Sequence, residues 1–415
     1  MKTSKFKMTE IGEIPTDWEV KRLGNVCTKI GSGATPTGGA AVYLSQGVSF
    51  IRSQNVYNGF FKCKGLAYIS ESAASLLDGV TVVEDDVLLN ITGDSVARCT
   101  KVPFDVLPAR VSQHVAIIRV IKDLINPLYL QCYLTSPSMQ AFMLNVATGQ
   151  GGSRNALTKG MVANFQVPIP PLAEQKAIVE ALSDVDALIA AQEELIEKKR
   201  AIKQGAMQEL LTGKKRLPGF GGKWIEKRLG DCATMFAGGT PSSKIEGYYG
   251  GDIPWVSISD ISIAGKYVER TAETLSDAGL NNSSAKWYPP NALLFAMYAS
   301  IGKCCIAKEM MTSSQAILGI YDLIDIDVEF LYYLLTFRND EFLMMGQTGT
   351  QSNLSKAIVE EIVINTPSLA EQKAIAEVLS DMDAEISELE AQKAKFESIK
   401  QGMMQELLTG KTRLV

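Results

Sequence analysis

The residue types that most often carry catalysis are scarce in this chain of 415 residues. It contains a single histidine, His114, which excludes histidine-based triads and multi-histidine metal sites. Its seven cysteines show no CxxC spacing, and only Cys304 and Cys305 are adjacent. This unpatterned set predicts reduced thiols in the cytoplasm and neither a disulfide framework nor a zinc site. The carboxylate runs 84–86 and 325–327 are more typical of solvated turns than of metal sites.

Three short motifs suggest cofactor or substrate chemistry, and each departs from its pattern. Leu408–Thr412 reads LTGKT like part of a P-loop, but Gln405 replaces the leading glycine and the segment ends a predicted helix instead of starting one. Tyr288–Asn291 has the composition of an amino-methyltransferase motif in the wrong order, and Phe236–Gly239 is too weak for a cofactor loop. The sequence therefore predicts no catalytic constellation and no metal site.

One long segment occurs twice, and it organises the chain. Leu172–Lys214 and Leu369–Lys411 align without a gap and share the blocks LAEQKAI, IKQG and MQELLTGK. Internal repeats of this kind set the architecture. The sequence therefore predicts two half-molecules, each a variable block followed by the same helix.

Both copies of the repeat read as long helices that pair with another helix. Pro170-Pro171 and the capping-box pattern Ser368–Glu371 mark the starts, while Gly213 and Gly410 fit left-handed caps at the ends. Such a helix is about 57 Å long at 1.5 Å per residue. The narrow apolar stripe, with alternating steps of three and four, consists of Ile178, Leu182, Val185, Ile189, Ile196, Ile202 and Leu210 in the first copy, and Ile375, Leu379, Met382, Ile386, Leu389, Phe396 and Met403 in the second.

Polar residues and glycines interrupt this stripe, and each has two interpretations. The polar residues indicate either a solvated, loosely paired middle with lysine stems along apolar neighbours, or positions that set the register of the pair. Gly205 and Gly402 suggest either close approach of another backbone or a simple bend. The polar residues on the stripe are Gln192, Lys199, Lys203, Lys393 and Lys400.

The two variable blocks share a framework of α+β texture. Each opens with W-x-x-K-R-L-G, at Trp18 and Trp224, and these tryptophans are expected in the core. Each contains a polar loop that ends in a basic residue and cysteine, Arg98-Cys99 or Lys303-Cys304. The matching strands and short helices are predicted at Val48–Ile51 and Ile253–Val256, Asp86–Leu89 and Asn291–Phe295, Pro127–Ser136 and Val328–Arg338, and Gln166–Ile169 and Ile362–Ile364. Since most polar loop residues differ, the pair suits two related but non-identical targets.

Charge is distributed unevenly around a net value of −5. The first block is net positive and the second is net negative. Nucleic-acid binders usually carry a basic footprint, so DNA binding would require local patches or a more basic partner. The start of the chain has no apolar run, and no stretch is long and apolar enough for a membrane span.

The opening IPxxW-x-x-x-x-L-G, the helix starts PPLAEQ and PSLAEQ, the LLTGK ends and the two-block layout resemble the DNA-specificity subunits of type I restriction–modification systems. The resemblance implies two α+β target-recognition domains, 1–171 and 215–368, with a central repeat helix, 172–214, and a C-terminal repeat helix, 369–415. A pseudo-two-fold repeat makes the helices an antiparallel coiled-coil spacer.

The resemblance also implies how such a subunit works. Each domain reads one half of an asymmetric bipartite target in double-stranded DNA, and the helices fix the gap and dock two methylation subunits, which restriction subunits join. Adenine N6-methylation and ATP-dependent cleavage belong to those partners, so this chain is expected to be non-catalytic and to hold no cofactor.

Under this resemblance, the expected DNA contacts are loop residues, because Arg, Lys, Asn and Gln can bond base edges in pairs. The segments Thr148–Asn155 and Thr348–Asn353 are favoured, since glycine lets backbone approach phosphate. The expected contacts are Arg52, Ser53, Gln54, Asn55, Thr92, Ser95, Arg98, Gln113, Gln150, Arg154 and Asn155 in the first block, and Ser257, Ser259, Asp260, Tyr298, Ser300, Lys303, Gln315, Gln351, Ser352 and Asn353 in the second.

Two other functions stay open. One is a non-enzymatic structural adaptor whose two αβ modules bind proteins on a coiled-coil rod. The other is an enzyme with diverged motifs. Activity of the isolated chain would favour the enzyme, whereas sequence-dependent methylation by an assembly with a methyltransferase would favour the specificity subunit.

Overall fold

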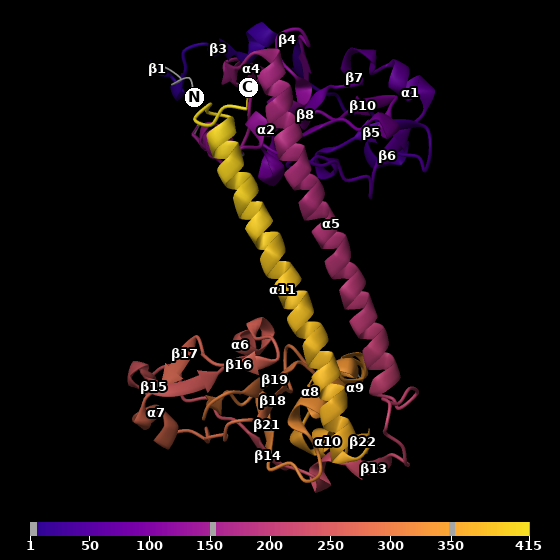
Figure 1. The fold of residues 1–415 in the computed structure, drawn as a ribbon, viewed down its shortest axis with the longest axis vertical. Helices are drawn as coiled ribbons and strands as arrows, with labels where there is room; N and C mark the ends of the chain where they lie inside the picture. The colour runs from indigo at the N-terminus through magenta and orange to yellow at the C-terminus, as the bar shows by residue number, and fades with distance from the viewer. Residues whose placement is uncertain (1–5, 150–154, 348–352, 415) are drawn as a thin grey trace. The chain divides into compact units, whose positions relative to one another are not determined.

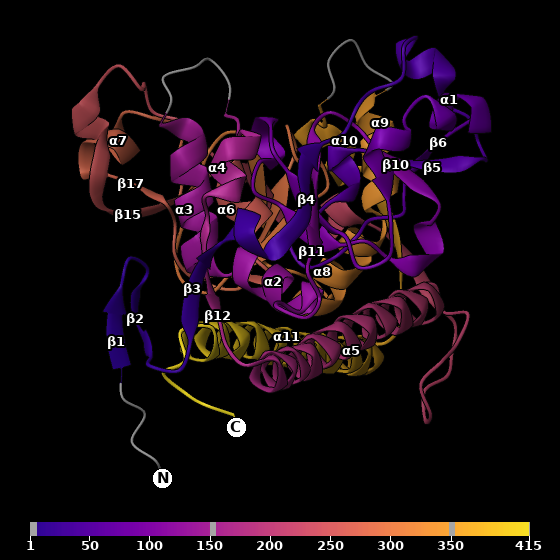
Figure 2. The same ribbon diagram turned by 90° about the horizontal axis from the view of Figure 1, so that it is seen from above.

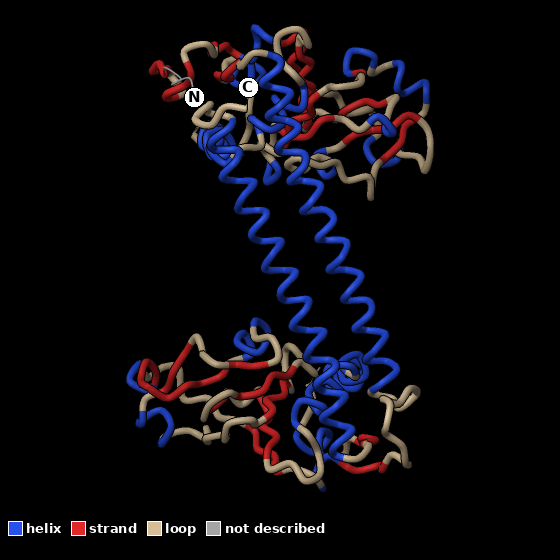
Figure 3. Tube along the Cα trace, viewed as in Figure 1, coloured by secondary structure: helices blue, strands red, loops and turns tan. Residues whose placement is uncertain are grey.

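The computed structural model describes residues 6–149, 155–347 and 353–414 (Figure 1). The chain divides into two compact units, one of residues 1–193 with 391–415 and the other of residues 194–390. Each unit contains a mixed helix and strand domain, together with the first part of one long helix and the last part of the other. The long helices are α5 (Leu172–Leu210) and α11 (Leu369–Leu407), each of 39 residues without interruption (Figure 3).

The first domain is built around two small sheets. One has the strand order β4-β11-β8-β9 with antiparallel neighbours throughout, and the other has the order β6-β5-β10-β7, in which β5 and β10 run parallel. The strands β1 and β2 form a separate hairpin (Figure 2). Its elements are β1 (Phe6–Thr9), β2 (Gly12–Pro15), β3 (Glu19–Arg22), β4 (Cys27–Ser32), β5 (Val48–Ile51), β6 (Ala67–Ile69), α1 (Glu71–Ser75), β7 (Thr81–Val82), β8 (Val87–Asn90), β9 (Cys99–Lys101), β10 (Ala109–Val111), β11 (Val115–Val120), α2 (Pro127–Leu134), α3 (Pro137–Thr148), α4 (Lys159–Ala163) and β12 (Gln166–Ile169).

The second domain repeats this plan. Its sheet β14-β21-β18-β19-β16 matches the first antiparallel sheet with one strand added, and its sheet β17-β15-β20 again contains a parallel pair, β15 and β20. Its elements are β13 (Ile225–Arg228), β14 (Thr234–Ala237), β15 (Tyr249–Val256), α6 (Ile258–Ile263), β16 (Tyr267–Val268), β17 (Glu273–Leu275), α7 (Asp277–Asn281), β18 (Leu293–Ala296), β19 (Cys304–Ala307), β20 (Thr312–Ser313), β21 (Ile317–Tyr321), α8 (Val328–Phe337), α9 (Asn339–Gln347), α10 (Lys356–Glu360) and β22 (Val363–Thr366).

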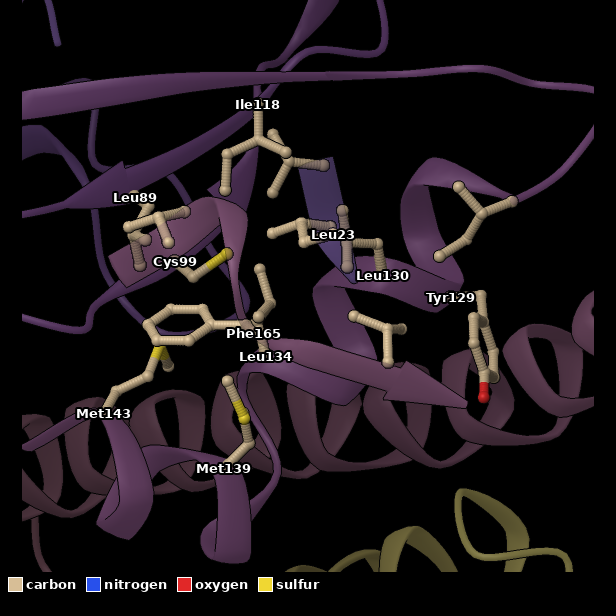
Figure 4. Packing of buried hydrophobic residues seen from close by; sticks show 14 of the residues in the cluster. Leu23, Leu89, Cys99, Ile118, Tyr129, Leu130, Leu134, Met139, Met143 and Phe165 are labelled. Atoms are coloured by element: carbon tan, nitrogen blue, oxygen red, sulfur yellow. The ribbon is translucent and has the colours of Figure 1, made fainter. Parts of the chain in front are cut away.

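Both long helices contribute to the main core of each unit. In the first unit, Leu182 near the start of α5 and Leu407 at the end of α11 belong to the cluster that holds the domain core around Trp18 (Figure 4 shows part of this packing). In the second unit, Leu379 of α11 and Leu210 of α5 take the matching places. Trp18 is fully buried, which confirms its predicted place in the core.

Alanine at either repeat leucine is expected to destabilise its own unit. Leu182 and Leu379 are fully buried, so Leu182→Ala and Leu379→Ala should each cost about 2–5 kcal/mol of unfolding free energy, as large-to-small core changes do. Urea unfolding of the full chain measures this. Leu188→Ala is the control on the same helix because Leu188 is 51% exposed, and it should change the free energy by about 0.5 kcal/mol or less. Equal effects of Leu182→Ala and Leu188→Ala would contradict the packing.

The repeated LAEQ block attaches each long helix to its domain. The buried amide of Gln175 accepts the N–H of Asn126 at 2.7 Å and donates to the carbonyls of Leu124 and Pro170. Gln372 does the same for Asp327, whose N–H it accepts at 2.9 Å. Because these bonds satisfy loop backbone that no strand pairs, the glutamine has a structural role in both copies.

A buried carboxylate from the same block accepts hydrogen bonds from an arginine that follows the end of the other helix. Glu174 is fully buried and accepts from Arg413 at 2.5 and 2.8 Å and from Trp18 Nε1 at 2.9 Å. The hydrogen bonds that Arg413 donates to Glu174 and Asp17 raise the pKa of Arg413. In the second unit Glu371 accepts from Arg216. The capping-box prediction is therefore only half right, since Ser368 caps Glu371 N–H at 3.4 Å but the Glu371 carboxylate turns to Arg216.

The polar residues of the helix stripe have partners on the other helix. In the first unit Asp186 pairs with Lys400 at 2.5 Å and Glu193 with Lys393 at 2.7 Å. Residue numbers rise along one helix as they fall along the other, so these segments run antiparallel. In the second unit the pairs Lys199–Glu385 and Lys203–Asp383 follow the same order. The pairing favours the interpretation in which these lysines set register, although each exposed pair contributes only about 0–1 kcal/mol.

The glycines of the repeat behave in two ways. Gly213 and Gly410 have φ values of 69° and 70°, so the left-handed caps are confirmed. The close backbone approach suggested for Gly205 and Gly402 is wrong, because a Cβ at either position would meet nothing within 4 Å. None of the helices among the described residues is long and apolar enough to span a membrane.

Candidate nucleic-acid interface

In the first unit, loops far apart in sequence meet at the ends of β5, β8 and β10. The Asn90 amide, at the end of β8, donates to the carbonyl of Ser53 at 2.9 Å, which joins the loops after β5 and β8. The N–H of Ile91 donates to the carbonyl of His114 at 3.0 Å, and that of Gly93 to the carbonyl of Asn155 at 3.1 Å. These bonds bring the segments 52–55, 92–98, 112–114 and 155 into one loop face.

The second unit builds a matching loop face with equivalent backbone bonds. The N–H of Ser314 donates to the carbonyl of Val256 at 2.9 Å, as that of Ser112 does to Ile51 in the first unit. The N–H of Met297 donates to the carbonyl of Ala316 at 2.8 Å, and the carbonyl of Met297 accepts the N–H of Leu354 at 3.0 Å. The segments 257–260, 298–303, 314–315 and 353 therefore correspond to those of the first unit.

Arg98 and Lys303 occupy the same place in the two loop faces. The Arg98 carbonyl accepts the N–H of Asn90 at 2.8 Å, and the Lys303 carbonyl accepts that of Ala296 at 2.9 Å. The residue before each has a positive φ, 73° at Ala97 and 83° at Gly302. A left-handed turn in each unit thus presents a cation, as the paired sequence motifs suggested.

The cysteines that follow these cations are buried and unreactive as nucleophiles. Burial raises the pKa of Cys304 to about 12 and that of Cys99 far above its usual range. Both thiols are therefore protonated near neutral pH, and neither can act as a thiolate nucleophile there.

The structure places the predicted contacts at different depths. Those that are exposed are Gln54, Gln113, Ser259, Lys303, Gln315 and Asn353. Those that are half-buried are Arg52, Ser53, Thr92, Ser95, Arg98, Asn155, Ser257, Tyr298 and Ser300. Gln150, Arg154, Gln351 and Ser352 lie outside the described residues.

Two of the predicted contacts are committed to the loops themselves. Asn55 is fully buried, accepts the N–H of Arg52 at 3.1 Å and donates to the carbonyl of Lys62 at 2.9 Å. Asp260 is 9% exposed and accepts the N–H groups of Ser257 and Ala272 at 2.8 and 2.9 Å. These side chains shape the loops, and the neighbouring Arg52 and Gln54 also donate to the carbonyl of Gly65, at 2.8 and 3.0 Å.

His114 joins the first loop face, although the sequence pattern did not select it. Its Nδ1 lies 2.6 Å from Thr92 Oγ1, and its Nε2 lies 3.4 Å from the amide nitrogen of Gln113. All three side chains can donate or accept hydrogen bonds. The signal that could have found it is its position beside Gln113 in the same polar turn.

The chemistry of both faces is hydrogen bonding, and each face carries a cation at the matching turn, Arg98 or Lys303. Within residues 6–149, 155–347 and 353–414, no group of three or more His, Cys, Asp or Glu side chains could hold a metal ion. The two units therefore define a class of protein with two similar loop faces whose polar side chains differ.

Comparison with known proteins gives this class a family. A model described as the type I restriction modification DNA specificity domain matches residues 15–199 and 222–397. The chain belongs to this family of specificity subunits, which are generally non-catalytic and whose activity is DNA recognition.

Curated relatives agree with that assignment, and solved structures share the fold. The chain is 25% identical to the type I restriction enzyme MjaVIII specificity subunit of Methanocaldococcus jannaschii, over all of this chain and 97% of the relative. It is 25% identical to the EcoR124I/EcoR124II specificity subunit of Escherichia coli over 52% of this chain and 55% of the relative. The fold resembles the S subunit from M. genitalium, with TM-score 0.58, 13% identity and coverage of 98% of each chain. It also resembles a chain from a study of assembly of the type I R-M system, with TM-score 0.63, 19% identity and coverage of 96% and 99%.

Proposed function

We propose that each loop face reads one half of an asymmetric bipartite sequence in double-stranded DNA. The observation that carries this proposal is the shared turn that presents Arg98 in one unit and Lys303 in the other, among polar neighbours that differ. A common scaffold with different hydrogen-bonding side chains is what two unlike half-sites require. On this proposal residues 1–171 and 215–368 are the target-recognition domains.

Further DNA contacts would come from other predicted residues of the two faces. Gln113 and Gln315 are exposed at matching turns, and a glutamine amide can bond the major-groove edge of adenine in two places. Arg98 and Lys303 suit guanine or phosphate. The favoured segments Thr148–Asn155 and Thr348–Asn353 would add contacts, since Asn155 and Asn353 belong to the two faces.

We also propose that the repeat helices, 172–214 and 369–415, act as an antiparallel coiled-coil spacer that sets the gap between half-sites. The ion pairs between α5 and α11 within each unit support this role. The spacer would dock two methylation subunits, and restriction subunits would complete the assembly in the cytoplasm. Methylation and cleavage would belong to those partners, whose basic surface would offset the net charge of −5 on this chain.

Replacing each of the two matching cations by alanine tests whether each unit reads its own half-site. With the chain assembled with its methylation subunits, Arg98→Ala should weaken discrimination in the first half-site alone, and Lys303→Ala in the second alone. Each lost paired base contact should cost about 1–3 kcal/mol, or roughly 5- to 150-fold. Methylation rates on duplexes altered in one half-site measure this. Equal loss at both halves from either variant would contradict separate reading.

A further inference from the structure

A short hairpin tip in the first unit carries an aromatic pair that the predicted contacts do not include. The tip is residues 55–62, which fold back through the bridge between Val56 and Phe61. The N–H of Tyr57 donates to the carbonyl of Phe60 at 3.1 Å, and Gly59 has a φ of 81°. The tip follows directly from the predicted contacts at 52–55.

The tip is fastened to the domain by backbone bonds and by Asn58. The N–H of Gly59 donates to the carbonyl of Cys99 at 2.9 Å, and the Asn58 amide oxygen accepts the N–H of Cys99 at 3.1 Å. The Asn58 amide nitrogen also donates to Gln140 of α3 at 3.0 Å. These bonds fix the tip beside Arg98, which precedes Cys99 in the chain.

Two aromatic rings and two cations gather on this tip. The rings of Tyr57 and Phe60 are stacked with centroids 4.8 Å apart, and Phe60 is 56% exposed. The Arg98 guanidinium lies 4.7 Å from the centroid of Tyr57, and Lys62 Nζ lies 5.5 Å from it. In the part of the chain that the structure describes, neither cation forms an ion pair with a carboxylate. The cations therefore keep their charge available for an anionic ligand.

The second unit has a different structure at the corresponding place. After β15 the chain forms the helix α6 (Ile258–Ile263), whose N-cap residue is Ser257. Ile263 is 85% exposed. The aromatic and basic combination therefore belongs to the first loop face, where the nearby Asn90 amide also ties the tip to β8 through the Val56 carbonyl at 3.4 Å.

We propose that this tip is an additional DNA contact, in which Phe60 packs against the apolar edge of a base or sugar in the first half-site beside the base contact of Arg98, while Lys62 meets a flanking phosphate. The inference rests on the proposed function and extends it to residues outside the predicted set. Phenylalanine commonly contacts the thymine methyl group or wedges at a base step, and cations beside an exposed ring suit the charged backbone.

The tip makes the first half-site interface larger than the loop turns alone would. The Tyr57 ring stacks on the Phe60 ring, and the Arg98 guanidinium lies over the Tyr57 ring. An exposed ring of this kind is not needed for the turn itself, whose backbone bonds require only the left-handed conformation at Gly59.

The experiment uses the full chain assembled with its methylation subunits, on the split sequence first mapped with the unaltered chain. Phe60→Ala should lower affinity for that sequence about tenfold, and the loss should vanish on duplexes with the first half scrambled. Lys62→Gln should reduce the slope of log affinity against log salt by about 0.9, the value for one phosphate contact. Ile263→Ala is the matched control in the second unit and should change neither quantity.

The outcomes separate this inference from the proposed function. If the unaltered chain directs no split-sequence methylation, the proposed function fails. If it does, and Phe60→Ala stays within twofold while Lys62→Gln leaves the salt slope unchanged, the tip is not a DNA contact. If Phe60→Ala lowers the melting temperature, the affinity of Phe60→Leu and the salt slope of Lys62→Gln decide the question. An unchanged affinity of Phe60→Leu together with an unchanged salt slope of Lys62→Gln then overturns the inference.

Discussion

Glu174→Ala is expected to destabilise the first unit by about 3–5 kcal/mol, the range for removing one partner of a buried ion pair. Glu174 is fully buried, and its carboxylate holds both Arg413 and the indole N–H of Trp18. Removing it leaves two donors without this acceptor at the place where the start of α5 meets the tail that follows α11. Urea unfolding followed by tryptophan fluorescence measures the loss.

The second unit offers a matched control for this prediction. Glu371 also pairs with Arg216 and is fully buried, but the indole nitrogen of Trp224 has no hydrogen-bond partner even with Glu371 in place. Glu371→Ala should therefore cost less than Glu174→Ala by about 1 kcal/mol, the contribution of one hydrogen bond. A change below about 1 kcal/mol for Glu174→Ala would contradict a structural role for the buried pair.

Lengthening both repeat helices is expected to change the gap in the DNA target. Seven residues inserted into α5 after Glu193 and seven into α11 after Glu390 add about 10.5 Å to each helix, which corresponds to about three base pairs. A seven-residue step rotates the helix face by only about 20°, so the apolar stripe continues. Mapping of methylated sites should show the same two half-sequences with a gap longer by about three base pairs.

The control for the helix insertion is to lengthen only one helix. Seven residues in α5 alone should shift its partners, so that Asp186–Lys400 and Lys203–Asp383 cannot form in one register, and methylation of either gap should fall. If both helices are lengthened and the gap stays unchanged, the spacer proposal is wrong.

Local signals predicted many elements because they depend on neighbours in the chain. Val48–Ile51 and Gln166–Ile169 are strands with the predicted bounds. The predicted helix 127–136 ends earlier, at Leu134, because Ser136 caps the next helix by accepting the N–H of Met139 at 3.4 Å. The repeat helices begin at the predicted residues and end at Leu210 and Leu407, three residues before the glycines whose left-handed conformation is a backbone requirement that is visible in sequence.

Features that depend on distant residues could not be predicted in the same way. Arg413 and Glu174 lie far apart in the chain, and the sequence pattern instead suggested a local capping role for the equivalent Glu371. Burial of Asn55 and Asp260 likewise depends on loop packing, which residue type alone does not reveal. The Tyr57 and Phe60 pair becomes a candidate contact only when its place beside Arg98 is known.

The most direct test of the account is a genome-wide map of methylated adenines in a host that carries the partner methylation subunit, with and without this chain. The account predicts one split sequence of two unlike halves at a constant gap, methylated only when the chain is present. Methylation that ignores sequence when the chain is present, or the same map without it, would contradict the claim that these two loop faces select the DNA target.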